Sequence, residues 1–331
     1  MAASKKTTRW GILACGNIAK KFAKDIPFAK GAELIACGSR TEGKAEAFGE
    51  EFDIPRRYHN YQDLLADADV DAIYVASPHT GHCEHTMRAM RAGKAVLCEK
   101  PLAVNRQQVQ QMIDCARAEK VFLMEAMWTR FLPVIAQARK LLAEGAIGEL
   151  RCVQANFGFR CGGDPEHRLM NPDLAGGGLL DVGIYPISLA HMLFGQPDQV
   201  TGAAELGDTG VDVQAGVVLK WQAGPIAILG CGVRTHMDHD AVIYGTDGVM
   251  RIPDFWHATH LEYGPRGGEP RKIEPEFAGH GFNYEIEEVQ ACLRAGKTES
   301  DVMPLAASLE IMAVMDELRC QWGVVYPFER Q

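Results

Sequence analysis

The stretch Leu97–Val104, LCEKPLAV, places a carboxylate, an ammonium and a proline directly after a buried apolar run. An arbitrary Glu–Lys pair at a strand end is most often a solvated ion pair. The alternative is a catalytic lysine, because ligands of open α/β folds bind at the carboxyl edge of the sheet. Pro101 fixes its own φ and lacks a donor, which helps to hold Lys100 in place.

The segment ACGNIA, residues 14–19, follows the first predicted strand and opens the first predicted helix. Dinucleotide folds usually carry GxGxxG or GxGxxA here, so that backbone amides approach a diphosphate at the helix N-terminus. Gly16 and Ala19 match this pattern, whereas Ala14 replaces the first glycine. The match fits a plain strand–helix turn equally well, but its position favours a nucleotide site. The residues assigned to that site are Gly16, Asn17 and Ile18.

The second predicted strand ends in Ser39 and Arg40, where a cofactor without a 2′-phosphate would favour an acid. A hydroxyl and a guanidinium suit a phosphate instead, and Lys44 about one turn later adds charge. The alternative is an ordinary exposed arginine at a strand end. The pattern favours NADP over NAD, with NAD still possible.

The elements that must position these residues alternate between strand and helix in the first part of the chain. Short apolar runs predict strands at 9–14, 34–37, 71–76, 94–98 and 121–124. Periodic segments predict helices at 17–25, 41–52, 82–92 and 105–119. Thr41 is the predicted cap of the second helix. Such alternation predicts right-handed βαβ units and a parallel sheet covered by helices.

After Glu149 the pattern changes to strands separated by turns. Strands are predicted at 150–157, 211–221, 226–233 and 241–244, and helices at 179–193, 284–295 and 305–322. The fold class is therefore α/β followed by α+β. A dinucleotide-binding domain is expected over 1–128. A substrate-binding and oligomerisation domain, built on an open and mainly antiparallel sheet, is expected over 129–331, and its last helix could pack back on the first domain.

The composition narrows the possible partners. The chain has 331 residues, which suits two domains, and its formal net charge of −9 without a basic cluster argues against nucleic acid and anionic membranes. Its 10 cysteines show no CxxC spacing, which fits free thiols in a reducing cytosol. We see neither a signal peptide at the start nor an apolar run of about 18 residues. A cytoplasmic protein is expected.

Four segments together resemble the Gfo/Idh/MocA oxidoreductase family. They are the Gly16 turn, Glu99–Pro101, MEAMWTRF at 124–131 and GGGLLDVGIY at 176–185. Within the family they are most similar to the group of dimeric dihydrodiol dehydrogenases and NADP-dependent D-xylose dehydrogenases. The resemblance covers nearly the whole chain and implies a Rossmann domain. The tyrosine at position 185, where many relatives carry histidine, is particular to this group.

The resemblance implies that Lys100 and Tyr185 are the catalytic pair. Asp181 and Tyr185 are four residues apart, so they share one face of the predicted helix. A nearby ammonium lowers the phenol pKa, ordinarily about 10, so that Tyr185 could exchange a proton with a substrate hydroxyl. The alternative for Tyr185 is a core tyrosine whose hydroxyl is satisfied.

Other site residues also follow from the resemblance. Trp128 and Phe157 are expected to line the substrate and nicotinamide pocket, although Phe157 could equally pack between domains. Arg130 could reach cofactor or substrate, or form a salt link. The residues expected beside the cofactor or its loop are Ser77, Pro78, His82 and Glu99.

No metal site is predicted, because hydride transfer needs none. His79, His82 and His85 resemble a metal cluster in sequence, but positions three and six apart drift around a helix axis.

The function expected is an NADP-dependent hydride transfer on a sugar or vicinal diol. The alternatives are an anhydro-sugar or inositol dehydrogenase of the same family, or a cofactor-binding regulator without turnover. A regulator needs neither Lys100 nor Tyr185.

A homodimer is expected through the second sheet. The predicted strands Val211–Trp221 and Ile226–Val233 carry apolar residues on both of their faces, and an exposed apolar sheet face usually marks an interface.

Overall fold

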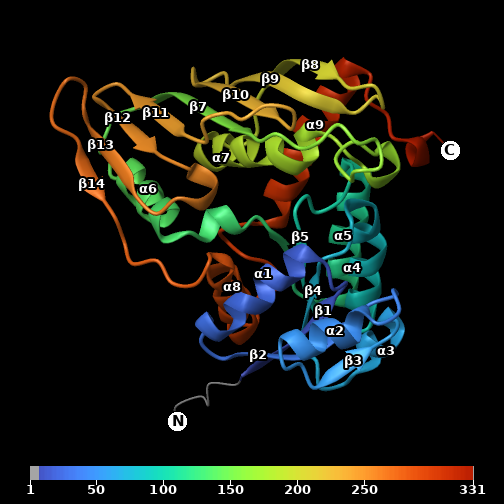
Figure 1. Ribbon diagram of the computed structural model, residues 1–331. Helices are drawn as coiled ribbons and strands as arrows, with labels where there is room; N and C mark the ends of the chain where they lie inside the picture. Colours follow the sequence, from blue (N-terminus) through green and yellow to red (C-terminus); the bar gives the residue numbers. More distant parts are fainter. Residues whose placement is uncertain (1–6, 331) are drawn as a thin grey trace, which may run out of the picture. The chain divides into compact units, whose positions relative to one another are not determined.

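Two compact units make up the chain in the computed structural model, which describes residues 7–330. The first unit comprises the chain up to Ala103 together with Gln107–Phe131 and Phe277–Ser308. The second comprises Val104–Arg106, Leu132–Glu276 and the chain from Leu309 onward. Each unit therefore assembles segments that are far apart in sequence, and each contains one β-sheet (Figure 1).

The first unit is built on a six-stranded sheet in the order β3-β2-β1-β4-β5-β6, and all its neighbouring strands are parallel. The strands are β1 (Thr8–Leu13), β2 (Ala32–Gly38), β3 (Arg56–Tyr58), β4 (Ala72–Val75), β5 (Ala95–Glu99) and β6 (Leu123–Ala126). The order runs outward from β1 and β4, which is the arrangement of a dinucleotide-binding sheet. The predicted fold class is confirmed, although the short polar strand β3 was missed.

Helices cover this sheet because its strands are apolar on both faces. Every residue of β4, β5 and β6 is buried. The helices are α1 (Asn17–Asp25), α2 (Lys44–Glu51), α3 (Tyr61–Ala66), α4 (His82–Arg91), α5 (Arg106–Glu119) and α8 (Phe282–Arg294). Figure 1 shows α8 beside α1 and α4 beside α5. The prediction that Thr41 caps α2 is wrong, because the helix starts after Gly43, whose φ of 71° lies in the left-handed region.

Asp25, fully buried at the end of α1, holds the start of α8. Its carboxylate accepts hydrogen bonds from the backbone N–H of His280 at 2.9 Å and of Phe282 at 2.8 Å. It also lies 2.7 Å from Nδ1 of His280. The N-cap residue of α8, Gly281, has no side chain to serve these donors. Asp25 therefore provides the cap that the local sequence of α8 lacks.

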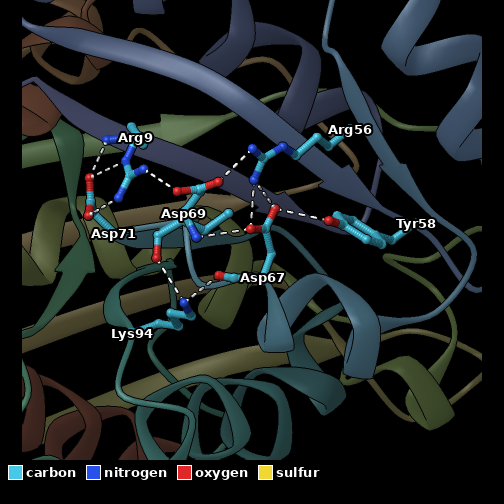
Figure 2. Close-up of polar contacts among 8 residues, drawn as sticks. Arg9, Arg56, Tyr58, Asp67, Asp69, Asp71 and Lys94 are labelled. Carbon is cyan, nitrogen blue, oxygen red and sulfur yellow. Dashed lines mark hydrogen bonds and ion pairs between the residues drawn. The ribbon is translucent and has the colours of Figure 1, made fainter.

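A charged network ties the amino ends of the strands together in the first unit (Figure 2). Its labelled members are Arg9, Arg56, Tyr58, Asp67, Asp69, Asp71 and Lys94. Arg9 and Arg56 both bind Asp69, each at 2.6 Å, and the ammonium of Lys94 donates to two backbone carbonyls, at 2.6 and 2.9 Å. Ligands bind at the opposite, carboxyl edge of such sheets. The network therefore serves the fold.

The second unit is built on an eight-stranded sheet in the order β14-β13-β12-β11-β7-β10-β9-β8. The strands are β7 (Leu150–Gly158), β8 (Gln199–Leu206), β9 (Asp212–Lys220), β10 (Ile226–Gly232), β11 (Ala241–Gly245), β12 (Gly248–Ile252), β13 (Leu261–Pro265) and β14 (Arg271–Ile273). Only β7 and β10 pair in parallel, so the predicted mainly antiparallel sheet is confirmed. The sequence did not reveal β8 or β12 to β14.

Helix α7 (Ile184–Phe194) packs on β7 and β10 and forms the centre of this unit. The remaining helices are α6 (Pro133–Ala143) and α9 (Leu305–Trp322). The helical segment Pro172–Phe194 is long and apolar enough to cross a membrane, which the sequence reading did not anticipate, but 78% of its apolar window is buried. Within the described chain it is the only such helix, and it serves as a core helix.

Candidate functional site

The turn between β1 and α1 leaves backbone donors open to a ligand. Ala14 has a φ of 79°, and the space around Gly16 is open, since a Cβ placed there would meet nothing within 4 Å. Gly16 is the N-cap of α1, and no side chain bonds to the first amides of the helix. These features suit a diphosphate, which the helix dipole also favours. The predicted residues Gly16, Asn17 and Ile18 therefore lie together at the N-cap and in the first turn of α1.

Just after β2, the guanidinium of Arg40 lies against the ring of Tyr61. The Arg40 guanidinium carbon lies 5.2 Å from the centre of the Tyr61 ring, a cation–π distance. Ser39 is buried, and its hydroxyl oxygen accepts from the backbone N–H of Thr41 at 3.1 Å. Lys44 is exposed at the first position of α2. Both cations belong to the segment just after β2, and the support from Tyr61 was not visible in the sequence.

The loops after β4 and β5 are joined through the buried ring of His82. Its Nε2 lies 2.7 Å from the carbonyl oxygen of Ser77, and its Nδ1 lies 2.8 Å from that of Pro101. Burial lowers the pKa of His82, whereas the hydrogen bonds to the two carbonyl oxygens oppose this shift. Pro78 lies between β4 and α4 in the same loop. The structure thus gives His82 a role in holding the loop that carries Lys100.

Glu99 is directed into the core of the first unit, where it is buried. It accepts hydrogen bonds from the hydroxyl of Tyr74 and, at 3.1 Å, from the backbone N–H of Lys100. The following peptide bond, between Lys100 and Pro101, is cis. These contacts suit the fixing of the loop, which is one of the two roles predicted for Glu99.

Trp128 and Arg130 lie on a 3-10 turn that follows β6. The Trp128 ring stacks on Phe282 of α8, with the ring centres 5.1 Å apart and the planes 6° apart. Arg130 is buried and donates to the carbonyl of Val302 at 3.4 Å. Both side chains are therefore anchored within the first unit.

The second unit brings the remaining predicted residues onto one helical segment and the strand beneath it. Tyr185 is buried at the start of α7, with its ring centre 5.1 Å from that of Phe157 on β7. Asp181 lies in a π-helical turn, Leu179–Gly183, directly before α7. Such π-turns frequently occur at functional sites, and the sequence predicted an ordinary α-helix here.

Three neighbours of these residues were not predicted. Arg168 holds Asp181 with two hydrogen bonds, at 3.0 and 3.3 Å. His239 and Trp256 lie against Phe157, with ring centres 4.6 and 5.1 Å away. Arg168 comes from a long connection without periodicity, so no local pattern could have revealed it.

Asp212, the first residue of β9, binds the backbone at the beginning of this helical segment. Its Oδ2 accepts from the backbone N–H of Leu179 at 2.6 Å, whereas its Oδ1 has no partner. Gly177 is required here because its φ is 119° and a Cβ would lie 2.2 Å from Oδ1 of Asp212. Burial raises the pKa of Asp212 to about 7. The segment that carries Asp181 and Tyr185 therefore starts on a carboxyl group that titrates near neutrality.

The histidines discounted as metal ligands have other partners. Nδ1 of His85 lies 2.9 Å from the hydroxyl of Ser77, and the rings of His79 and His82 meet edge to face. Over residues 7–330 no group of three or more histidine, cysteine, aspartate or glutamate side chains could hold a metal ion.

Comparison with known proteins gives a consistent result. The oxidoreductase family with an NAD-binding Rossmann fold matches residues 8–127, and the GFO/IDH/MocA C-terminal domain matches residues 135–251. The chain is similar to trans-1,2-dihydrobenzene-1,2-diol dehydrogenase from Mus musculus, with 36% identity, and from Danio rerio, with 38%. Each alignment covers 98% of this chain and 99% of the relative.

Two solved structures extend the comparison. Aldose-aldose oxidoreductase from Caulobacter crescentus, complexed with glycerol, superposes with a TM-score of 0.88 at 26% identity, covering 97% of this chain and 100% of that one. KijD10, a 3-ketoreductase from Actinomadura kijaniata in complex with NADP and TDP-benzene, gives 0.85 at 27% identity, covering 95% and 98%. With matches to both of its domains and relatives aligned over nearly its full length, the chain belongs to the Gfo/Idh/MocA oxidoreductase family as an NAD(P)-dependent dehydrogenase or reductase.

Proposed function

We propose that this protein uses NADP to transfer a hydride between nicotinamide and the hydroxyl- or carbonyl-bearing carbon of a sugar or vicinal diol. The observation that carries the proposal is the buried Tyr185 phenol, which lies beside Phe157 on the segment that also holds Asp181. The names of the relatives, diol dehydrogenases and sugar oxidoreductases, support this substrate class.

In this proposal Tyr185 exchanges the proton of the substrate oxygen. In oxidation its phenolate accepts the hydroxyl proton, and in reduction its phenol donates to the carbonyl oxygen. Lys100 lowers the pKa of the phenol as a neighbouring cation, and Asp181, held by Arg168, accepts a hydrogen bond from the substrate. Bound nicotinamide supplies or accepts the hydride.

The aromatic rings around Phe157 form a wall suited to one face of a ring substrate. Within the second unit Phe157 is in ring contact with Tyr185, His239 and Trp256, and His239 also meets Trp256. Aromatic faces bind the apolar face of a sugar or of a dihydrodiol ring. We assign Trp128 to the substrate or nicotinamide as well. The cofactor residues in the proposal are Gly16, Asn17, Ile18, Ser39, Arg40, Lys44, Ser77, Pro78, His82, Glu99, Lys100 and Arg130.

A substrate panel tests the proposed reaction. Aldoses, polyols and dihydrodiols are assayed by NADPH absorbance, with NAD in parallel. We expect turnover with at least one vicinal diol or pyranose and a higher kcat/KM with NADP. If the protein binds the cofactor but turns over no compound of the panel, the result would instead support the alternative of a cofactor-binding regulator without enzymatic activity.

Arg40→Ala is expected to weaken NADP specifically, by about 1.5–3 kcal/mol if one charge-assisted hydrogen bond to the 2′-phosphate is lost. NAD lacks that phosphate, so its kcat/KM should change little. Steady-state kinetics with both cofactors provide the measurement. Arg91→Ala, which removes an exposed arginine from the end of α4, is the matched control. An equal loss of kcat/KM with both cofactors would show that Arg40 does not bind the 2′-phosphate.

We also propose a homodimer through the outer face of the eight-stranded sheet. On β10 the buried positions alternate with Ile226 and Ile228, which are 37% and 47% exposed, and Val218 on the adjacent β9 is 44% exposed. By this alternation the three side chains lie on the face opposite the core. An apolar face of this kind usually marks an interface, and two-fold dimers are the commonest assembly.

Light scattering at micromolar concentration tests the dimer. We expect about twice the 36.3 kDa of one chain, reduced to a single-chain mass by Ile228→Asp. Phe28→Asp, which places a charge at an exposed residue of the first unit, should leave the mass doubled. A single-chain mass for the unaltered protein would refute the proposal.

A further inference from the structure

A pocket of about 640 Å³ lies beyond the ends of β7 and β10 in the second unit. Its walls come from three segments, which are the chain at Arg160 after β7, the hairpin between β8 and β9, and the chain from Arg234 to His236 after β10. Small-molecule sites usually have a volume of this size. The residues that line the pocket are additional to the candidate site residues.

Two guanidinium groups lie next to each other in this pocket. Arg160 and Arg234 are directly opposite each other in an antiparallel bridge, so their side chains lie on the same side of it. The backbone N–H of Cys161 donates to the carbonyl of Val233 at 2.9 Å and holds the two segments together. Both arginines are exposed at the surface of the pocket. The fold therefore fixes two cationic side chains side by side.

The two guanidinium groups form no ion pair and no side-chain hydrogen bond within residues 7–330. Other arginines of the same unit are paired, since Arg168 binds Asp181 and Arg151 binds Glu149. The chain carries 43 acidic side chains against 34 of lysine and arginine, so acids are not scarce. Two neighbouring cations repel each other, and a phosphate between them removes this repulsion and accepts parallel hydrogen bonds from both.

The hairpin between β8 and β9 adds hydrogen-bond acceptors and an apolar surface to the pocket. Glu205 and Asp208 supply two carboxylates, and Leu206, which is 41% exposed, supplies an apolar side chain. The carboxylates oppose the binding of an anion alone, because like charges repel. They accept hydrogen bonds from hydroxyl groups. The pocket as a whole is therefore suited to a ligand that carries both a phosphate and hydroxyl groups.

The two arginines belong to the same two segments as the aromatic wall around Phe157. Arg160 follows Phe157 by three residues, which span at most about 10 Å. The segment that begins at Arg234 continues to His239, whose ring lies against Phe157 and whose Nε2 lies 2.8 Å from the carbonyl oxygen of Gly158. The pocket therefore adjoins the wall, at a distance that a phosphorylated sugar can span.

We propose that this pocket binds a phosphate group of the substrate, so that the substrate class is a phosphorylated sugar or polyol. Arg160 and Arg234 bind the phosphate oxygens while the carbon skeleton lies against Phe157. The assignment to the substrate rests on the proposed function, whereas the binding of a phosphorylated sugar by the two arginines does not. Because the phosphate does not react, the arginines contribute equally to binding of the substrate and of the transition state, and their loss raises KM more than it lowers kcat.

The test compares sugars that differ in their anionic group. D-glucose and D-galactose, their 1-phosphates and 6-phosphates, their uronic acids and their UDP derivatives are titrated by calorimetry into the full-length protein with NADP, and each is then assayed for turnover. We expect a phosphate-bearing compound to bind at least about tenfold more tightly than its parent sugar and uronic acid. The monophosphates and the UDP derivatives distinguish a phosphate monoester from a nucleoside diphosphate. Equal affinities for the neutral and phosphorylated compounds, or a preference for the uronic acids, would overturn the proposal.

Variants of the two arginines locate the binding. Arg160→Ala and Arg234→Ala should each weaken binding of the phosphorylated compound, and raise its KM, by about tenfold or more, the effect of losing one charge-assisted hydrogen bond. The kcat and the affinity for the neutral sugar should change little. Arg251→Ala, which removes an exposed arginine of β12 outside the pocket, is the matched control and should change none of these values. Equal losses for the phosphorylated and the neutral sugar would contradict a phosphate contact.

Failure of this proposal differs from failure of the proposed function. If neutral diols are turned over and neither arginine variant alters any compound's affinity, the proposed function stands and the phosphate pocket is refuted. If both arginines are needed to bind a phosphorylated sugar but no compound is turned over, the pocket stands as a binding site, and both its assignment to the substrate and the proposed hydride transfer are refuted.

Discussion

Replacing Tyr185 by phenylalanine is expected to lower kcat by about 10²- to 10⁴-fold, the usual contribution of a general acid or base, while NADPH still binds. The variant keeps the ring that packs on Phe157 at 5.1 Å and loses only the hydroxyl group. A rate assay measures the chemistry, and fluorescence titration measures cofactor binding. Near-normal kcat in Tyr185→Phe would remove this residue from the mechanism.

Two further variants distinguish a proton-transfer role for Tyr185 from a packing role. Lys100→Met should also be severe, and any remaining oxidation activity should require higher pH, because the phenol pKa returns toward its ordinary value of about 10. The matched control is Tyr244→Phe on β11, which loses one hydrogen bond of 3.2 Å to Gln154. Its kcat should stay close to that of the unaltered enzyme.

The second large effect is a stability that falls with rising pH because of Asp212. Burial raises its pKa from the ordinary 3.8 to about 7, so the folded state keeps the proton over a pH range in which the unfolded chain has lost it. The folded state then binds more protons than the unfolded state, and the free energy of unfolding decreases between about pH 4 and pH 7. At about 1.36 kcal/mol per pKa unit, the total loss approaches about 4 kcal/mol.

Asp212→Asn tests this directly, because asparagine keeps an oxygen to accept from the Leu179 N–H but cannot ionise. Urea unfolding at several pH values gives the measurement. Relative to the unaltered protein, the variant should gain stability as the pH rises from 4 to 7. Asp208→Asn, which alters an exposed carboxylate between β8 and β9, should show no such relative gain. Parallel curves for the unaltered protein and Asp212→Asn would contradict the argument.

The sequence predicted the parallel sheet well because its strands are buried on both faces and read as continuous apolar runs. Strand β4, Ala72–Val75, is a clear case. Strand β3, Arg56–Tyr58, was missed because it is short and polar, and tertiary pairing with β2 defines it. Strands β13 and β14 were missed for a similar reason, since they are short and partly exposed.

The sequence motifs identified the candidate site residues but not the side chains that hold those residues in place. Glu99 and Lys100 stood out because charge follows a buried strand, yet the hydroxyl that binds Glu99 belongs to Tyr74 on another strand. Arg168 and Asp212 were not identified, because each acts on the helix of Tyr185 from a distant segment. Contacts of this kind depend on the assembled fold and leave no local pattern.

The cap that Asp25 places on α8 has a consequence for biosynthesis. The donors that satisfy this buried carboxylate, such as the N–H of Phe282, follow it by up to 258 residues. At about 5–20 residues per second, a ribosome needs roughly 13–50 s to deliver them after Asp25 has been made. During that interval the nascent first unit lacks α8, and its apolar surface is open to aggregation. The first unit therefore stays incomplete until its last segment, Phe277–Ser308, has been made.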